Sequence, residues 1–175
     1  GAPGLAWSDL ERDDLPALTA LVEQGASGSL TVRAVRSRSC AIDGWLTLSA
    51  GRRAGDLPGP CREPLPPVGG LVPYWSDYLA AAAADSYDAR PGLLAEAVAA
   101  SGACLQSSGA GAAIGAADPD GSVGSTYSDT VPTSVECPVV LVDGGALPVT
   151  QPERADAVTR LDALVAQVVG AAPGA

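Results

Sequence analysis

The run Pro138-Val139-Val140-Leu141-Val142-Asp143-Gly144-Gly145 is the strongest fold signal in the chain. Its unbroken aliphatic stretch, bounded by a proline and two glycines, predicts a β-strand buried on both faces, which is typical of parallel sheets. Open α/β sheets bind their ligands beyond the carboxyl ends of such strands, where Asp143-Gly144-Gly145 lie here. A tight turn that needs glycine explains the same three residues equally well.

Helical patterns surround this strand along the sequence. The segments with apolar residues at helical spacing are residues 9–25, 43–50, 78–85, 92–102 and 153–169. Two further segments, residues 29–35 and 111–118, are predicted as strands. Because strands and helices alternate, we expect an α/β fold with a mainly parallel sheet and flanking helices, in a single domain over residues 1–175.

A proline-rich loop interrupts the alternation over residues 55–75. Its prolines are Pro58, Pro60, Pro64, Pro66, Pro67 and Pro73. Proline donates no backbone hydrogen bond, so no regular element is expected there. A loop of this length inside a compact domain is usually functional or tied down, and Cys61 near its middle suits a covalent link.

The composition narrows the class of protein. The chain has 175 residues, 47% of them hydrophobic, which is enough for a globular core. All ten basic residues are arginine, and the abundance of Ala, Gly and Pro is typical of a GC-rich genome. The formal net charge of −10 argues against a nucleic-acid partner, because phosphate binding depends on basic surfaces. No apolar run approaches the roughly 18 residues of a membrane-spanning helix, so no transmembrane segment is expected.

One local group of basic residues stands out in this acidic chain. It consists of Arg33, Arg36, Arg38, Arg52 and Arg53. A group of this size suits a single bound anion rather than a polyanion.

Four cysteines predict two disulfide bonds. Zinc sites need short Cys-x₂₋₄-Cys spacing or histidines, and the chain has neither. Of the three connectivities we expect Cys40–Cys61 and Cys104–Cys137, each stabilising the fold by about 3–4 kcal/mol. The alternative is four buried free thiols in a cytosolic protein.

Disulfide bonds persist in oxidising compartments, so we expect an extracytoplasmic location, secreted or associated with the cell envelope. The chain shows no signal peptide or membrane anchor. It begins at Gly1 without a Met, which is typical of a mature or trimmed form.

Reactive side chains gather in the segment Arg38-Ser39-Cys40-Ala41-Ile42-Asp43. A hydroxyl, a thiol and a carboxylate lie within five residues before a predicted helix, as a hydrolase presents its nucleophile. Ser39, Cys40 and Asp43 are therefore the candidate catalytic residues. Arg38 would favour a thiolate, but the chain has no histidine to serve as a base or metal ligand. The structural alternatives are a disulfide for Cys40 and, for Asp43, the N-cap position of the following helix.

Two other motifs have simpler explanations. Asp118-Pro119-Asp120-Gly121-Ser122, with Asp129 at its twelfth position, resembles a calcium loop, but Val123 replaces the loop glycine. A β-turn is therefore expected there. Gly109-Ala110-Gly111 with Gly115 resembles a nucleotide fingerprint, but it precedes a predicted strand instead of following one, so no nucleotide site is expected.

Several segments, taken in chain order, follow one known pattern. They are Gly4–Asp9 with Leu15–Leu18 and Glu23–Ala26, Cys40–Gly51, Pro91–Ala103, Gly111–Asp118, and Val139–Asp143 with the final helix. In this order they resemble the opening, the nucleophile turn, the next helix and strand, and the region before the second metal cluster of the alkaline phosphatase superfamily. That superfamily includes sulfatases and phosphodiesterases. The resemblance implies an alkaline phosphatase-like core and, in an active member, metal-dependent ester hydrolysis.

The departures from this pattern decide the functional expectation. The family's opening metal-binding Asp falls on Pro3, and its nucleophile falls on Cys40, or on Ser39 in a register shifted by one. Its metal-binding histidines have no counterpart in a chain without histidine. Its later Asp-His-Gly segment would lie beyond Ala175, so the chain resembles the front part of such a domain or a shortened relative.

We therefore expect a catalytically inactive alkaline phosphatase-like domain outside the cytoplasm, with a binding or assembly role in the cell envelope. We expect no cofactor, and an envelope protein or a second copy of the chain as partner. The alternative is a phosphate- or sulfate-ester hydrolase that uses a divalent metal and whose remaining ligands lie outside this chain.

Overall fold

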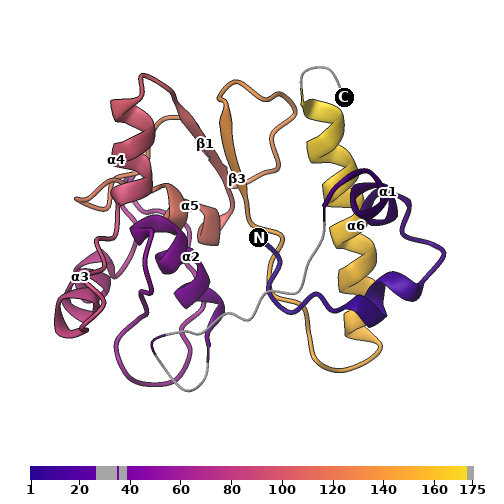
Figure 1. Cartoon of the computed structure of the whole chain (residues 1–175), viewed down its shortest axis with the longest axis horizontal. Coiled ribbons are helices and arrows are strands. Elements are labelled where there is room, and N and C mark those ends of the chain that lie inside the picture. The colour runs from indigo at the N-terminus through magenta and orange to yellow at the C-terminus, as the bar shows by residue number, and fades with distance from the viewer. Residues whose placement is uncertain (27–34, 36–38, 173–175) are drawn as a thin grey trace. The chain divides into compact units, whose positions relative to one another are not determined.

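The structure, a computed structural model, describes residues 1–26, 35 and 39–172 (Figure 1). The chain divides into two compact units, and each is described by itself. The helical unit consists of Gly1–Thr31, Val131–Val135 and Gly144–Ala175, and the sheet unit of Val32–Thr130 and Glu136–Asp143. The single domain expected from the sequence stays a prediction.

The sheet unit confirms the α/β class: its described residues form a parallel sheet of three strands in the order β2-β1-β3. These strands are β1 (Leu105–Ser108), β2 (Tyr127–Ser128) and β3 (Val139–Val142). β1 pairs in parallel with both neighbours, and Leu105 lies opposite Val139. The predicted strand at 138–143 is thus confirmed, but its side chains are half-buried rather than buried on both faces. Among the described strands, β3 pairs with β1.

The strand predicted over Gly111–Asp118 is wrong, because residues Ala110–Ala116 form helix α5. The strand comes earlier, as β1, whose sequence Leu-Gln-Ser-Ser lacks an apolar run. The small side chains of α5 are required by close packing on α2: a Cβ on Gly111 would lie 2.0 Å from the Trp45 Nε1 atom. Small residues that let a helix approach a neighbour carry no helical period in the sequence, so the pattern gave no sign of the helix.

Four helices build the core of the sheet unit, together with the segments between them. They are α2 (Ala41–Ala50), α3 (Trp75–Ala84), α4 (Leu93–Ala100) and α5. Buried Ile42, Trp45 and Leu46 of α2 pack with Ile114 of α5 and with Trp75. The three helices predicted at 43–50, 78–85 and 92–102 are confirmed, with ends shifted by at most three residues.

The helical unit contains a 3₁₀ helix, η1 (Trp7–Glu11), and the helices α1 (Pro16–Gln24) and α6 (Glu153–Ala171). Figure 1 draws α1 and α6 side by side, and Leu15 and Leu18 pack with Val158 and Leu161 in a separate core. The helix predicted over 9–25 is therefore two elements, because Pro16 favours a helix start and occupies the first turn of α1. The strand predicted at 29–35 lies outside the described residues except for Val35.

The proline-rich loop predicted at 55–75 contains no helix until α3 begins at Trp75, and backbone hydrogen bonds fix it at several points. Val68 and Leu71 exchange backbone hydrogen bonds around Gly69-Gly70, whose positive φ angles of 60° and 80° suit a two-residue hairpin turn. The Leu71 backbone also bridges to Ser122. Within the described ranges, no helix is both long and apolar enough to cross a membrane.

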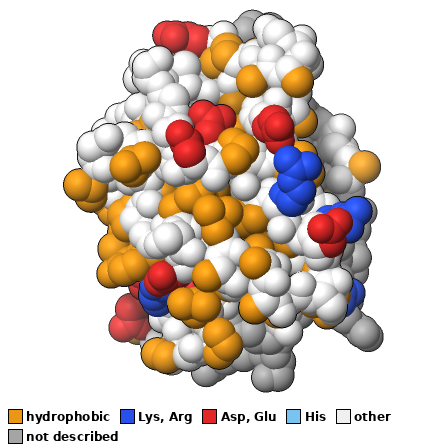
Figure 2. All heavy atoms as spheres, turned by 90° about the vertical axis from the view of Figure 1, so that its left-hand side faces the viewer, with side chains coloured by type: hydrophobic (Ala, Val, Ile, Leu, Met, Phe, Trp, Pro, Cys, Tyr) orange, Lys and Arg blue, Asp and Glu red, His pale blue; other side chains and the backbone are white. Residues whose placement is uncertain are grey.

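The same loop and α3 leave large apolar side chains on the surface. Val68, Leu71, Tyr74 and Leu65 are 73%, 53%, 49% and 44% exposed. Figure 2 shows hydrophobic side chains over much of the middle of the face that includes α3. An exposed apolar surface of this kind is typical of protein contact sites.

Candidate functional site

Both predicted disulfide pairings are confirmed. Cys40 bonds to Cys61 with their Cα atoms 5.5 Å apart, and Cys104 bonds to Cys137 with their Cα atoms 5.1 Å apart. Cys40 is the N-cap residue of α2, so the bond joins the start of this helix to the proline-rich loop. A disulfide sulfur has no thiolate, which is the nucleophilic form of cysteine, so Cys40 in this state cannot attack an ester.

Asp43 is the third residue of α2, within its first turn, and is buried, with 1% of its surface exposed. Its Oδ2 accepts a hydrogen bond from the Cys40 backbone N–H at 2.9 Å. Its Oδ1 accepts a second from the Asp56 backbone N–H at 3.1 Å. The carboxylate thus caps the helix N-terminus, where the helix dipole favours negative charge, and also holds the start of the proline-rich loop.

The three predicted catalytic residues therefore meet at the N-terminus of α2, as the sequence indicates. Ser39 is exposed beside Cys40. The thiol is oxidised, however, and the carboxylate is bound to two backbone amides. The structural alternative for Cys40, a disulfide, is confirmed. Asp43 is not the predicted N-cap residue, because α2 begins two residues earlier and Cys40 takes that position; Asp43 caps the helix from its third residue instead.

A charged cluster that the sequence did not predict lies next along the loop. Arg62 forms a two-pronged pair with Asp56, its Nε lying 2.5 Å from Asp56 Oδ2, and a second pair with Asp77 at 2.8 Å. Its guanidinium also lies 4.4 Å from the centre of the Tyr74 ring. The bonds to Asp56 raise the pKa of Arg62, and burial raises the pKa of Tyr78 to about 12. This positive charge is therefore neutralised by two carboxylates.

The residues at the carboxyl ends of β1 and β3 form a second polar group. Gly109-Ala110-Gly111 does follow a strand and open a helix, so the reason for setting this motif aside was wrong. The Gly111 N–H donates to Asp143 Oδ2 at 2.8 Å, and a Cβ on Gly109, whose φ is +87°, would lie 2.9 Å from the Asp143 Cβ. The position where a helix N-terminus attracts an anion is thus filled by the protein's own carboxylate.

The motif at residues 118–122 is a β-turn, as expected. The Gly121 N–H donates to the Asp118 carbonyl at 2.8 Å. The Ser122 hydroxyl donates to Asp120 Oδ1 at 2.7 Å and lowers the pKa of that carboxyl. Nowhere in the described part of the chain do three or more His, Cys, Asp or Glu side chains meet in a group that could hold a metal ion.

The described members of the predicted basic group have separate partners. Arg52 pairs with Asp88 at 3.1 Å, and Arg53 lies 5.5 Å from the centre of the Tyr87 ring. Arg33, Arg36 and Arg38 lie outside the described residues.

In the helical unit, the Asp9 carboxylate near the N-terminus pairs with an arginine of the same unit. Pro3, where the sequence resemblance would put a metal-binding Asp, accepts the Leu147 N–H through its carbonyl at 2.9 Å. Asp9 Oδ1 accepts from Arg154 Nε at 2.8 Å, and the hydrogen bonds from Arg154 lower the pKa of Asp9. Arg154 also donates to the Gly4 carbonyl at 2.8 Å.

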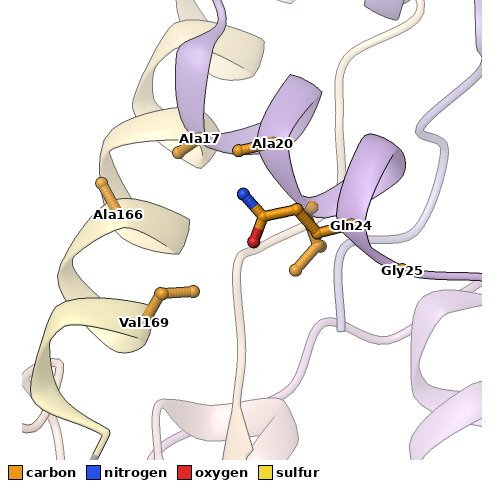
Figure 3. Close-up of a pocket in the computed structure, with 7 residues that line it drawn as sticks. Ala17, Ala20, Gln24, Gly25, Ala166 and Val169 are labelled. Atoms are coloured by element: carbon orange, nitrogen blue, oxygen red, sulfur yellow. The ribbon is translucent and has the colours of Figure 1, made fainter. Parts of the chain in front are cut away.

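Two concave features lie within the helical unit. The first, of about 280 Å³, lies between α1 and α6, and Figure 3 shows the Gln24 amide pointing into it. It is lined by Ala17, Ala20, Leu21, Gln24, Gly25, Ala166 and Val169, and so contains no charged side chain. The second, of about 360 Å³, lies between residues 144–148 and α6, and Arg160 lines it.

No protein-family model, curated protein or solved structure matches the chain. The function must therefore be inferred from the geometry.

Proposed function

We propose that this chain is a non-catalytic, disulfide-stabilised α/β domain that acts outside the cytoplasm, with a binding or assembly role in the cell envelope. The observation that carries the proposal is the state of the α2 N-terminus. The Cys40 sulfur, at the position of the nucleophile, is bonded to Cys61, and Asp43 beside it is bound to two backbone amides.

The electrostatics of this region agree with a structural role. Ester hydrolysis needs a nucleophile activated by a base or metal and positive charge directed at the developing anion. Arg62, the cation nearest to Cys61 in the sequence, is held by Asp56 and Asp77 instead. A guanidinium that two carboxylates neutralise offers little positive charge to a developing anion, which agrees with a structural role.

The proposed location rests on the sulfur chemistry. Two disulfide bonds fit an extracytoplasmic location, because reducing compartments keep thiols free. The proposed ancestry is an alkaline phosphatase-like core, and the parallel sheet with flanking helices is compatible with it.

The proposed binding or assembly role is supported by the exposed apolar side chains of the proline-rich loop. Val68 and Leu71 flank a hairpin turn closed by two backbone hydrogen bonds, so this chain would lose less backbone entropy on binding a partner there than an unpaired loop would. An envelope protein or a second copy of the chain is the partner that we propose.

A set of hydrolysis assays tests the proposal. The oxidised protein is given p-nitrophenyl phosphate, bis(p-nitrophenyl) phosphate or p-nitrophenyl sulfate, with zinc, manganese or calcium supplied. We expect no turnover above that of the free metal, and intact mass spectrometry should show both disulfides formed. The double variant Cys40→Ser/Cys61→Ser is the matched control for a hidden thiol contribution.

One result would replace the proposal with the hydrolase alternative. Metal-dependent turnover that is lost in Asp43→Asn, while the circular dichroism spectrum is unchanged, would show that Asp43 acts on a substrate or metal and not only on the backbone.

A further inference from the structure

Arg160 differs from every other arginine that the structure describes. Arg12, Arg52, Arg62, Arg90 and Arg154 each pair with a carboxylate, and Arg53 lies over a tyrosine ring. Arg160 has neither a carboxylate within 4.0 Å, nor a hydrogen bond, nor a ring partner among the described residues. The chain carries twenty acidic residues against ten basic ones, so an unpaired guanidinium stands out.

This guanidinium lines the cavity of about 360 Å³ in the helical unit. The lining residues are Gly144, Gly145, Ala146, Leu147, Pro148, Ala157, Arg160, Leu161 and Leu164. Arg160 is the one charged side chain among them, and Leu147 and Leu161 are buried to more than nine-tenths beneath the surface. The volume lies within the usual range of small-molecule sites, roughly 300–1,000 Å³.

Backbone hydrogen bonds fix the loop that forms one wall. The Gly144 N–H donates to the Gly1 carbonyl at 2.8 Å, and the Leu147 N–H donates to the Pro3 carbonyl at 2.9 Å. A Cβ on Gly144 would lie 2.9 Å from Leu161 Cδ1, so glycine lets the loop approach α6 this closely. The cavity is therefore formed without a ligand, and the glycines noted in the sequence shape it.

We propose that this cavity binds a small monocarboxylate with a short apolar chain, whose carboxylate pairs with Arg160 and whose chain lies against Leu147 and Leu161. A guanidinium offers two parallel N–H donors that match the two oxygens of a carboxylate. A single arginine with no further cation in the lining balances one negative charge, which favours a monoanion over a phosphate dianion. The proposal goes beyond the proposed function and does not depend on the absence of catalysis at α2.

A nitrogen-15 NMR titration of the whole chain with butanoate tests the site. We expect saturable shifts of the Gly145 and Ala146 amides and of the Arg160 side-chain Nε–H. Acetate should bind about fifteenfold more weakly, because it lacks two methylene groups worth roughly fourfold in affinity each. Butylammonium, with the same chain and the opposite charge, should cause no saturable shift.

The variant Arg160→Gln should weaken butanoate binding by at least about tenfold while the remaining spectrum stays unchanged. Arg90→Gln is the matched control, since Arg90 is also exposed and lies in the other unit, and it should leave binding unchanged. Arg160→Lys keeps the charge without the two-pronged geometry and should bind with intermediate strength. Three results would each overturn the proposal: no saturable shift with butanoate, equal binding by Arg160→Gln, or equal affinity for acetate and butanoate, which would mean an adventitious ion only.

Discussion

The N-terminus of α2 and the cavity beside Arg160 differ in what their polar groups already bind. At α2, the thiol is in a disulfide, the Asp43 carboxylate holds two backbone amides, and Arg62 holds two carboxylates. At the cavity, the guanidinium has no such partner among the described residues. The comparison teaches that reactive residue types close together in sequence need not be available for chemistry. Availability depends on what the fold has left unpaired.

The largest expected effect on stability comes from removing the Cys40–Cys61 bond. This change tests whether the disulfide at the N-terminus of α2 stabilises the fold. Cys40→Ser/Cys61→Ser should lower the free energy of unfolding by about 3 kcal/mol, because the unfolded chain loses the restraint of a loop of 21 residues. Urea unfolding followed by circular dichroism measures this.

The second disulfide supplies the control. Cys104→Ser/Cys137→Ser opens a loop of 33 residues, so it should cost a few tenths of a kcal/mol more. A loss below about 1 kcal/mol for the first pair would mean that the α2 N-terminus does not depend on its disulfide.

The next effect concerns Asp43. Asp43→Ala should lower the free energy of unfolding by about 2 kcal/mol or more, because it leaves the buried N–H groups of Cys40 and Asp56 without an acceptor. Asp43→Asn keeps one acceptor oxygen and should lose less. Equal stability of wild type and Asp43→Ala in urea unfolding would remove the capping explanation and reopen a role for Asp43 in binding.

Whether the sequence predicts an element or a contact depends on how far apart along the chain the interacting residues lie. β3 and α6 have clear apolar patterns, so the sequence predicts both. A capping role for Asp43 is also predicted, because it is a local interaction between residues three apart, but the helix starts two residues earlier than expected and Cys40 is the N-cap. The sequence does not predict β1, because only one of its four residues has a large apolar side chain. It predicts a strand in place of α5, because the small residues of this helix are required by close packing against Trp45, which lies far away in the sequence.

The same reasoning applies to the two polar regions. The Arg62 cluster depends on the path of an irregular loop, which no periodic pattern encodes. Arg160 is distinguished only by lacking a partner, and a sequence cannot show that, since any of twenty acidic residues might have reached it.

A smaller, pH-dependent effect is expected at Asp9, whose partner Arg154 lies on the same helix as Arg160. The hydrogen bonds from Arg154 lower the pKa of Asp9 in the folded protein below its value in the unfolded chain. The resulting stabilisation is present above the unfolded pKa, about 4, and is lost as the pH falls toward the folded pKa. Asp9→Asn should therefore unfold at lower urea than wild type near neutral pH.

Under strongly acidic conditions the two proteins should unfold at nearly the same urea concentration. Asp13→Asn, at an exposed neighbouring position, is the control and should leave the urea midpoint of unfolding unchanged at both pH values. An offset between wild type and Asp9→Asn that does not change with pH would contradict the ion-pair explanation, because packing alone would then account for the loss.

The smallest effect on stability is expected at Arg160, and it is the sharpest test of the comparison. Arg160→Gln removes no described hydrogen bond or ion pair, so the free energy of unfolding should change by less than about 0.5 kcal/mol. Arg154→Gln, on the same helix, removes the partner of the largely buried Asp9 and should lower the urea midpoint clearly. Equal losses in the two variants would show that Arg160 has a structural partner after all, and the difference between the two polar regions would disappear. A loss confined to Arg154→Gln leaves Arg160 as a charge that the fold does not use, which is the condition that a ligand site requires.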